Sequence, residues 1–181
     1  MWKLNKPEPV KLIIGILACD QKALDATIEM LDAKFGPIDA DSPTWPFSQT
    51  DYYENETGSE ILKKFVSIEK LICPGKLAGI KIKTNKMEAA LAKTLNLSLS
   101  RPVNLDPGYI EPSKLVLASA KNFAHRIYIG KKIWAEVTLS YSNGWKAYDY
   151  TFPDHTEDRY HDFFSQARTK LNQQLKERAK H

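Results

Sequence analysis

The first forty residues show two hydrophobic patterns in succession. Val10–Ala18 is a run of apolar residues, which is typical of a strand covered on both faces. Asp20 follows as a good N-cap, and Gly36–Pro37 provides a stop signal for a helix. The apolar positions between these signals recur at helical spacing and are Leu24, Ile28, Leu31 and Phe35. The chain is therefore predicted to open as a strand followed by a helix.

The next segments favour a loop and then short strands. Residues 37–47 hold three prolines and are predicted to form a loop, whereas 48–53 and 64–69 are compatible with strands. Residues 103–106 alternate between apolar and polar side chains, and Pro107–Gly108 is typical of a turn that ends such a strand.

Two segments allow more than one assignment. Pro74 can open a helix, and apolar residues continue at helical spacing, so we predict one helix over residues 74–95. The alternative is a strand at 80–84, followed by a shorter helix that Asn85 and Glu88 would cap. Residues 113–121 are compatible with either a helix or a strand.

The clearest local signal is a β-hairpin between residues 125 and 141. Two segments rich in β-branched and aromatic residues flank Gly130-Lys131-Lys132, which predicts a three-residue loop. The resulting register pairs Ile127 with Ala135 and Arg126 with Glu136. The face predicted to join the core carries Ile127, Ile129, Ile133, Ala135, Val137 and Leu139. The opposite face carries Arg126, Tyr128, Trp134, Glu136, Thr138 and Ser140.

The C-terminal part is predicted to contain one more strand and a long helix. A turn at 142–144 leads to a strand at 145–150, and Asp154 with Glu157 forms a capping box for a helix over 157–178. The apolar side of this helix is formed by Phe163, Phe164, Ala167, Leu171 and Leu175. The order of elements predicts a single α+β domain over residues 1–181, with a largely antiparallel sheet flanked by about three helices.

Composition narrows the class of protein. The 181 residues are 43% hydrophobic and carry 26 basic and 22 acidic side chains, a net charge of +4 that is too small to indicate nucleic-acid binding by itself. Cys19 and Cys73 are the only cysteines, so a disulfide framework is excluded and a cytoplasmic location is favoured. We expect no membrane span, because no run of 18 apolar residues exists.

Polar side chains gather in and around the hairpin, and they form the candidate site. Arg126 could clamp an anion, His125 could serve in acid–base chemistry, and Asp106 or Glu136 could bind a cation or act as a base. The opposing interpretation is a solvated sheet face with an ordinary Arg126–Glu136 ion pair, worth about 0.2–1 kcal/mol. The catalytic candidates are Asp106, His125 and Glu136. The ligand-binding candidates are Asp51, Glu54, Asn104, Lys121 and Arg126. No metal site and no cofactor are assigned.

The usual nucleotide-binding motifs are missing from the sequence. Gly75-Lys76 and Gly130-Lys131 both lack the upstream glycine and the following residue of a phosphate-binding loop. No glycine-rich dinucleotide turn and no Gly-x-Ser-x-Gly nucleophile motif is found.

Several short strings are shared with one protein family. They are Pro9–Leu12, Phe35–Ile38, Thr50–Glu54, Lys83–Asn85, Asn104–Tyr109, Lys114–Ser119, His125–Tyr128 and Ala135–Thr138. With these strings the chain resembles the bacterial domain-of-unknown-function 4416 family over nearly its whole length. The resemblance implies a single-domain cytosolic bacterial protein and no particular mechanism. Some relatives are described as GTP-binding, but this sequence lacks the phosphate loop.

The first functional hypothesis is the binding of a small anionic ligand or nucleotide, with or without catalysis. The alternatives are an RNA-associated module, in which Tyr128 and Trp134 stack on bases and the basic C-terminal helix contacts phosphates, and a protein-interaction subunit without a ligand. The sequence leaves the oligomeric state open.

Overall fold

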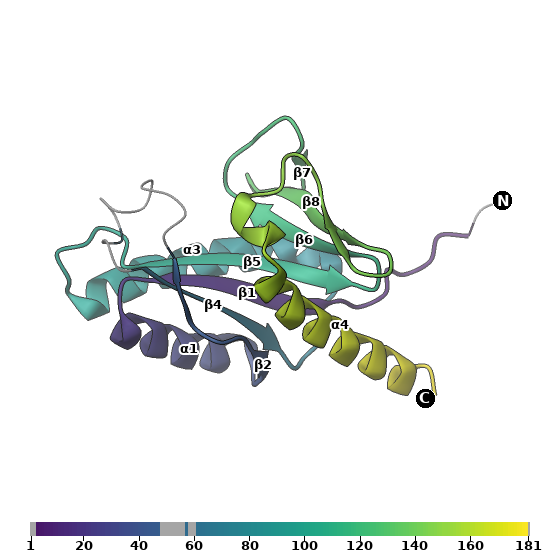
Figure 1. Cartoon of the computed structure of the whole chain (residues 1–181), viewed down its shortest axis with the longest axis horizontal. Coiled ribbons are helices and arrows are strands. Elements are labelled where there is room, and N and C mark those ends of the chain that lie inside the picture. The colour runs from purple at the N-terminus through teal and green to yellow at the C-terminus, as the bar shows by residue number, and fades with distance from the viewer. Residues whose placement is uncertain (1–2, 48–56, 58–60, 181) are drawn as a thin grey trace.

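The computed structural model describes residues 3–47, 57 and 61–180 of the chain (Figure 1). Asp51, Glu54 and the strand predicted at 48–53 lie outside the described residues. The strands are β1 (Lys11–Ala18), β2 (Ile38–Asp41), β3 (Trp45–Phe47), β4 (Ile61–Ile68), β5 (Val103–Glu111), β6 (Lys114–Ser119), β7 (Ile127–Tyr128), β8 (Trp134–Tyr141) and β9 (Trp145–Ala147). The helices are α1 (Gln21–Phe35), α3 (Leu77–Leu95) and α4 (Asp158–Arg178), with the short 3₁₀ helices η2 (Pro74–Lys76) and η3 (Pro153–Thr156).

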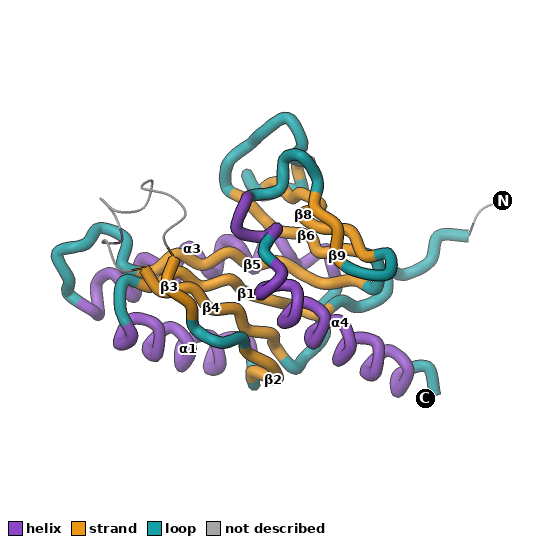
Figure 2. Tube along the Cα trace, viewed as in Figure 1, coloured by secondary structure: helices purple, strands orange, loops and turns teal. Residues whose placement is uncertain are grey.

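The described strands form one nine-stranded sheet in which every pairing is antiparallel. The order is β2-β4-β1-β5-β6-β8-β7, with β3 paired to β4 and β9 paired to β8 (Figure 2). Together with the three helices, this sheet confirms the predicted α+β fold.

Helices cover both faces of the sheet. All eight residues of β1 are buried, as its apolar run predicts. Leu12, Ile14 and Ile16 pack with α1 and α3, whereas Ile13 packs with α4 on the other side. In Figure 1, α4 lies in front of the sheet and α3 lies behind it. We refer below to the α1/α3 side and the α4 side of the sheet.

Local signals were accurate for α1 and α3. The side chain of Asp20 caps α1 by accepting a hydrogen bond from the amide of Ala23 at 2.7 Å, and Gly36 follows with a φ of 98°. A helix over 74–95 is confirmed by η2 and α3, so the alternative strand at 80–84 is wrong. The open segment 113–121 contains strand β6.

The loop predicted at 37–47 is wrong, because this segment contains two short strands. β2 and β3 both pair with β4 in the described sheet. Pro46 is tolerated in β3 because an outer strand needs a backbone donor on one side only.

The turn predicted at Pro107–Gly108 is also wrong, because β5 runs straight through it. The amide of Leu105 points away from β1, toward α3, and Pro107 has the same orientation two residues later. Proline has no backbone N–H, but in this orientation Pro107 would not donate to β1, so the pairing of β1 with β5 loses no hydrogen bond. Gly108 is needed because a Cβ there would lie 2.4 Å from the carbonyl oxygen of Val116 in β6.

The predicted hairpin register is confirmed, but its predicted core face is confirmed only for Ile133, Ala135 and Leu139. Ile127 pairs with Ala135 as expected, yet Ile127 is 72% exposed because β7 is the last strand in the sheet order. The pairing of β6 with β8 shifts by one residue after Val137, which leaves Thr138 as an extra residue. Ala135 therefore packs on the α1/α3 side and Leu139 on the α4 side.

Candidate functional site

The candidate residues of β5 and β8 share the α4 side of the sheet. Glu136 lies opposite Leu117, which lies opposite Gly108 in β5. Asn104 and Asp106 precede Gly108 at steps of two residues, so their side chains point to the same side as Glu136. We call this surface the polar face. It consists of three networks of charged side chains, described in turn.

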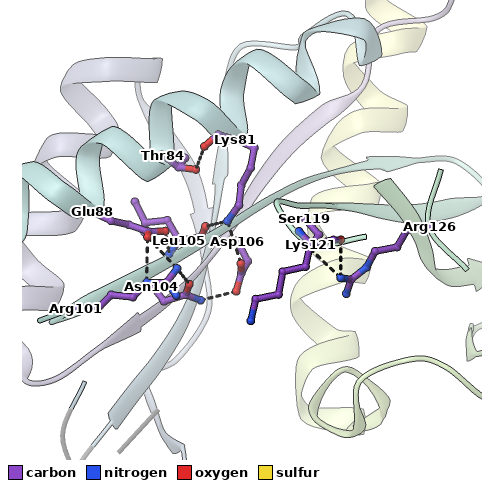
Figure 3. Close-up of polar contacts among 10 residues, drawn as sticks. All are labelled: Lys81, Thr84, Glu88, Arg101, Asn104, Leu105, Asp106, Ser119, Lys121 and Arg126. Atoms are coloured by element: carbon purple, nitrogen blue, oxygen red, sulfur yellow. Dashed lines mark hydrogen bonds and ion pairs between the residues drawn. The ribbon is translucent and has the colours of Figure 1, made fainter. Parts of the chain in front are cut away.

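The first network fills a notch between β5 and β6. These strands pair over Gly108–Glu111 only, so the backbone of Leu105 has no strand on that edge. Two α3 side chains replace the missing strand. Glu88 accepts from the Leu105 amide at 2.8 Å, and the Nζ atom of Lys81 donates to the Leu105 carbonyl at 2.7 Å (Figure 3).

Asp106 is the most open acid of this network. Its carboxylate accepts from Nδ2 of Asn104 at 2.6 Å and from Nζ of Lys81 at 3.3 Å, while 44% of its side chain remains exposed. Burial alone would raise the pKa of Asp106. The charge of Lys81, the Asn104 amide and the more distant charge of Lys63 outweigh burial and lower that pKa. Asp106 is thus an ionised carboxylate that can still reach a ligand.

Arg101 closes the network on its outer side. Its Nε and Nη2 atoms lie 3.1 and 2.9 Å from Oε2 of Glu88, and Nη2 also donates to Asn104 (Figure 3). Burial raises the pKa of Glu88, although the charges of Lys81 and Arg101 oppose that shift. The first network thus ties α3 to β5 through charged contacts.

The second network lies between β6, β7 and β8. The buried carboxylate of Glu136 contacts Nε2 of His125 at 3.0 Å and Nε of Arg126 at 2.7 Å. The Nη1 atom of Arg126 donates to Oγ of Ser119 at 2.9 Å and to the backbone carbonyl of Lys121 at 3.0 Å (Figure 3). The predicted Arg126–Glu136 pair therefore exists, but the protein shields it from solvent.

A tyrosine fixes the orientation of His125. The ring of Tyr150 stacks on the imidazole with centroids 4.2 Å apart and an angle of 7°, and the Tyr150 hydroxyl donates to the carbonyl of Val137 at 3.0 Å. Glu136 holds Nε2 of His125, whereas Nδ1 has no hydrogen-bond partner within the described part of the chain. His125 is therefore oriented on one side and available on the other.

The third network is buried and was missed by the sequence interpretation. The Nζ atom of Lys63 in β4 forms an ion pair with Asp154, whose other oxygen lies 3.0 Å from Nδ1 of His155. Among the described residues, three aromatic rings surround Nζ of Lys63, those of Phe47, Phe65 and Tyr160, with centroids 5.0 to 5.1 Å away.

The predicted role of Asp154 as a helix cap is consequently wrong. Its side chain caps no helix. Burial would raise the pKa of Asp154, but the neighbouring His155 and Lys63 lower it well below its usual range. The sequence gives a hint only in hindsight, because Lys63 and Lys64 interrupt an otherwise apolar strand.

The structure brings most predicted site residues together on the polar face. Asn104 and Asp106 belong to the first network. His125, Arg126 and Glu136 belong to the second, to which Lys121 contributes its carbonyl. The sequence interpretation missed Lys63, Lys81, Glu88, Arg101 and Asp154.

The shared strings of the sequence correspond to a family match along most of the fold. The family model described as a domain of unknown function, DUF4416, matches residues 8–171. The chain belongs to the DUF4416 family. All three networks lie inside the DUF4416 match. No curated protein and no solved structure matches the chain.

The described part of this DUF4416 protein lacks two features, a cluster of metal ligands and a helix that could span a membrane. Within the described residues, no three histidine, cysteine, aspartate or glutamate side chains are grouped so that they could hold a metal ion. No helix in the described ranges is long and apolar enough to cross a membrane.

Proposed function

We propose that the polar face binds a small anionic ligand, such as a nucleotide or another phosphate compound. Basic side chains reach this side of the sheet from separate elements, with Lys63 on β4, Lys81 on α3 and Arg126 before β7. Each of these cations is paired with a carboxylate, of Asp154, Asp106 and Glu136 respectively, so a phosphate would bind by sharing or replacing that carboxylate as the partner of Lys81 or Arg126.

The observation that carries the proposal is the state of Asp106. An aspartate is ionised at neutral pH, and the 44% exposure of this side chain leaves oxygen lone pairs free for a ligand. A carboxylate in this position can accept from sugar hydroxyls or bind the Mg²⁺ ion that accompanies a nucleotide. A nucleotide or sugar phosphate offers both an anion for the basic groups and hydroxyls for Asp106.

The test is a thermal-shift screen, followed by calorimetry, with nucleotides, sugar phosphates and inorganic phosphate, each with and without Mg²⁺. A ligand at about 100 times its dissociation constant should stabilise the protein by roughly 2.7 kcal/mol. Asp106→Asn and Arg126→Ala should each lose the shift. Lys176→Ala, an exposed residue of α4, is the control and should keep it. A hit that both site variants retain would contradict the proposal.

A catalytic role at the same face is a second candidate, favoured by His125. Glu136 and the Tyr150 ring hold the imidazole in one orientation, as a general base requires. If a ligand from the screen is turned over, His125→Gln should lower kcat far more than it raises KM. Glu136→Gln removes the charge that holds Nε2 of His125 and should also lower kcat.

A screen without any hit would shift the weight to the RNA alternative. Tyr128 is 58% exposed and packs edge-to-face against Trp134 with ring centroids 5.6 Å apart, so a base could stack there. RNA binding should then weaken steeply as salt rises and should fail in Tyr128→Ala.

A further inference from the structure

A cleft of about 350 Å³ lies between α1 and α3, on the opposite side of the sheet from the polar face. Its apolar residues come from both helices and are Met30, Ala33, Met87 and Ala90. Its remaining residues are all lysines, with Lys34 on α1 and Lys83 and Lys86 on α3. The cleft therefore combines an apolar floor with a basic rim.

The rim carries positive charge that the described residues do not neutralise. Lys34, Lys83 and Lys86 are exposed, and none of them forms an ion pair with a described carboxylate. No acidic residue lines the cleft. A partner with carboxylates on both of its flanks would complement this rim, because the lysines come from both helices.

The floor suits an apolar side chain of varied shape. Met87 is 6% exposed and Met30 is half-buried, and both side chains line the gap between the two helices. Methionine is flexible and polarisable and is common at surfaces that accept a docking helix. A groove between two packed helices also matches the ridge of side chains on a third helix.

We propose that this cleft docks an acidic amphipathic helix of a partner protein. Apolar residues at i, i+3 and i+4 of that helix would lie on Met30 and Met87, and glutamates or aspartates on its two flanks would pair with the lysines. A single fatty acid has one carboxylate and would satisfy one side of the rim. A second copy of this chain would bring lysines against lysines, which opposes self-association through this surface.

The chain offers a direct reporter of this cleft. It has three methionines, Met1, Met30 and Met87, so ¹³C-methyl labelling of methionine gives three NMR signals, two of them from the cleft. The probe is a synthetic helical peptide with a leucine stripe flanked by glutamates. A second peptide with lysine in place of each glutamate is the matched control.

The acidic peptide should shift the Met30 and Met87 signals in a saturable way, and the lysine peptide should not. The double variant Lys83→Glu/Lys86→Glu should bind the acidic peptide at least tenfold more weakly. Lys176→Glu/Lys180→Glu, which changes two exposed lysines elsewhere, should bind it as the wild type does.

Three results would overturn the proposal. The first is no shift at millimolar acidic peptide, and the second is an equal response to both peptides. The third is a response of Met30 and Met87 to anionic lipid vesicles or to protein concentration alone, without a response to the acidic peptide.

Discussion

Gly108 shows how one residue determines the path of a strand. The carbonyl of Val116 and the side chain of Leu117 leave no room for a Cβ at this position. In contrast, a Cβ at Gly79 in α3 would meet only Nζ of Lys131 at 3.8 Å, an ordinary contact at the end of a flexible side chain. The two glycines therefore form a matched pair.

We expect Gly108→Ala to destabilise the protein by about 1–3 kcal/mol, because β6 must move to accept the methyl group. Gly79→Ala should stabilise it by up to about 1 kcal/mol, because alanine is the better helix former. Urea denaturation of both variants measures these changes. Equal stability of the two variants would show that β5 and β6 are farther apart than described.

Asp154→Asn should destabilise the protein by about 3–5 kcal/mol at pH 7, because Lys63 would keep a buried charge without its counter-ion. Adding Lys63→Met to this variant should restore part of the loss. Denaturant unfolding of the two single variants and the double variant gives the coupling energy.

The destabilisation caused by Asp154→Asn should depend on pH, because it depends on the ionisation of the Asp154 carboxylate. The pKa of Asp154 is lowered in the folded state, so its contribution is complete above the unfolded value of about 3.9 and is lost as the pH falls toward the folded value. The difference between wild type and Asp154→Asn should therefore shrink in acid. A difference that stays constant from pH 7 to pH 2 would contradict the assigned pair.

At the scale of elements, side chains of α3 form the hydrogen bonds that a neighbouring strand would otherwise form with the backbone of Leu105 in β5. We expect Glu88→Ala to cost about 1–3 kcal/mol, since the amide of Leu105 would lose its partner in a buried position. Hydrogen exchange at the Leu105 amide should accelerate in this variant. Glu29→Ala, an exposed glutamate of α1, is the control and should leave that amide unchanged.

Elements whose structure follows from a local sequence pattern could be predicted, whereas elements whose structure depends on residues distant in the sequence could not. The helices α1 and α4 follow from their apolar spacing, and β1 follows from its apolar run. Pro107–Gly108 was misread because a turn and an unpaired strand edge favour the same two residue types. The outward face of β7 depends on its place at the end of the sheet, which no local pattern contains.

The same distinction applies to the candidate site. Asn104 and Asp106 alternate with apolar residues, so strand periodicity predicts that these two share a side. That Glu136 lies on the same side depends on the pairing of β5, β6 and β8, which the periodicity does not contain. Lys63 and Asp154 lie 91 positions apart in the sequence, and their pairing arises only when β4 and η3 come together. Periodicity thus predicts which way a side chain points, whereas the identity of its partner depends on the tertiary fold.

At the scale of the whole molecule, one buried tyrosine and two partly buried ones make the stability depend on pH in alkali. Burial raises the pKa of Tyr109, Tyr150 and Tyr160, that of Tyr160 to about 12. The unfolded chain loses these protons near pH 10, so the stabilising effect is complete below pH 10 and disappears as the pH rises toward 12. The free energy of unfolding should fall over this range, and less steeply in Tyr160→Phe.

The antiparallel pairing of β1 with β5 also has a consequence for biosynthesis. β1 leaves the ribosome first, yet β5, which covers one of its edges, is made only after α3. Until then the apolar strand β1 presents an open edge to other nascent chains. Ribosome-bound chains that end before Val103 should therefore aggregate or bind chaperones, and chains that extend past β5 should not.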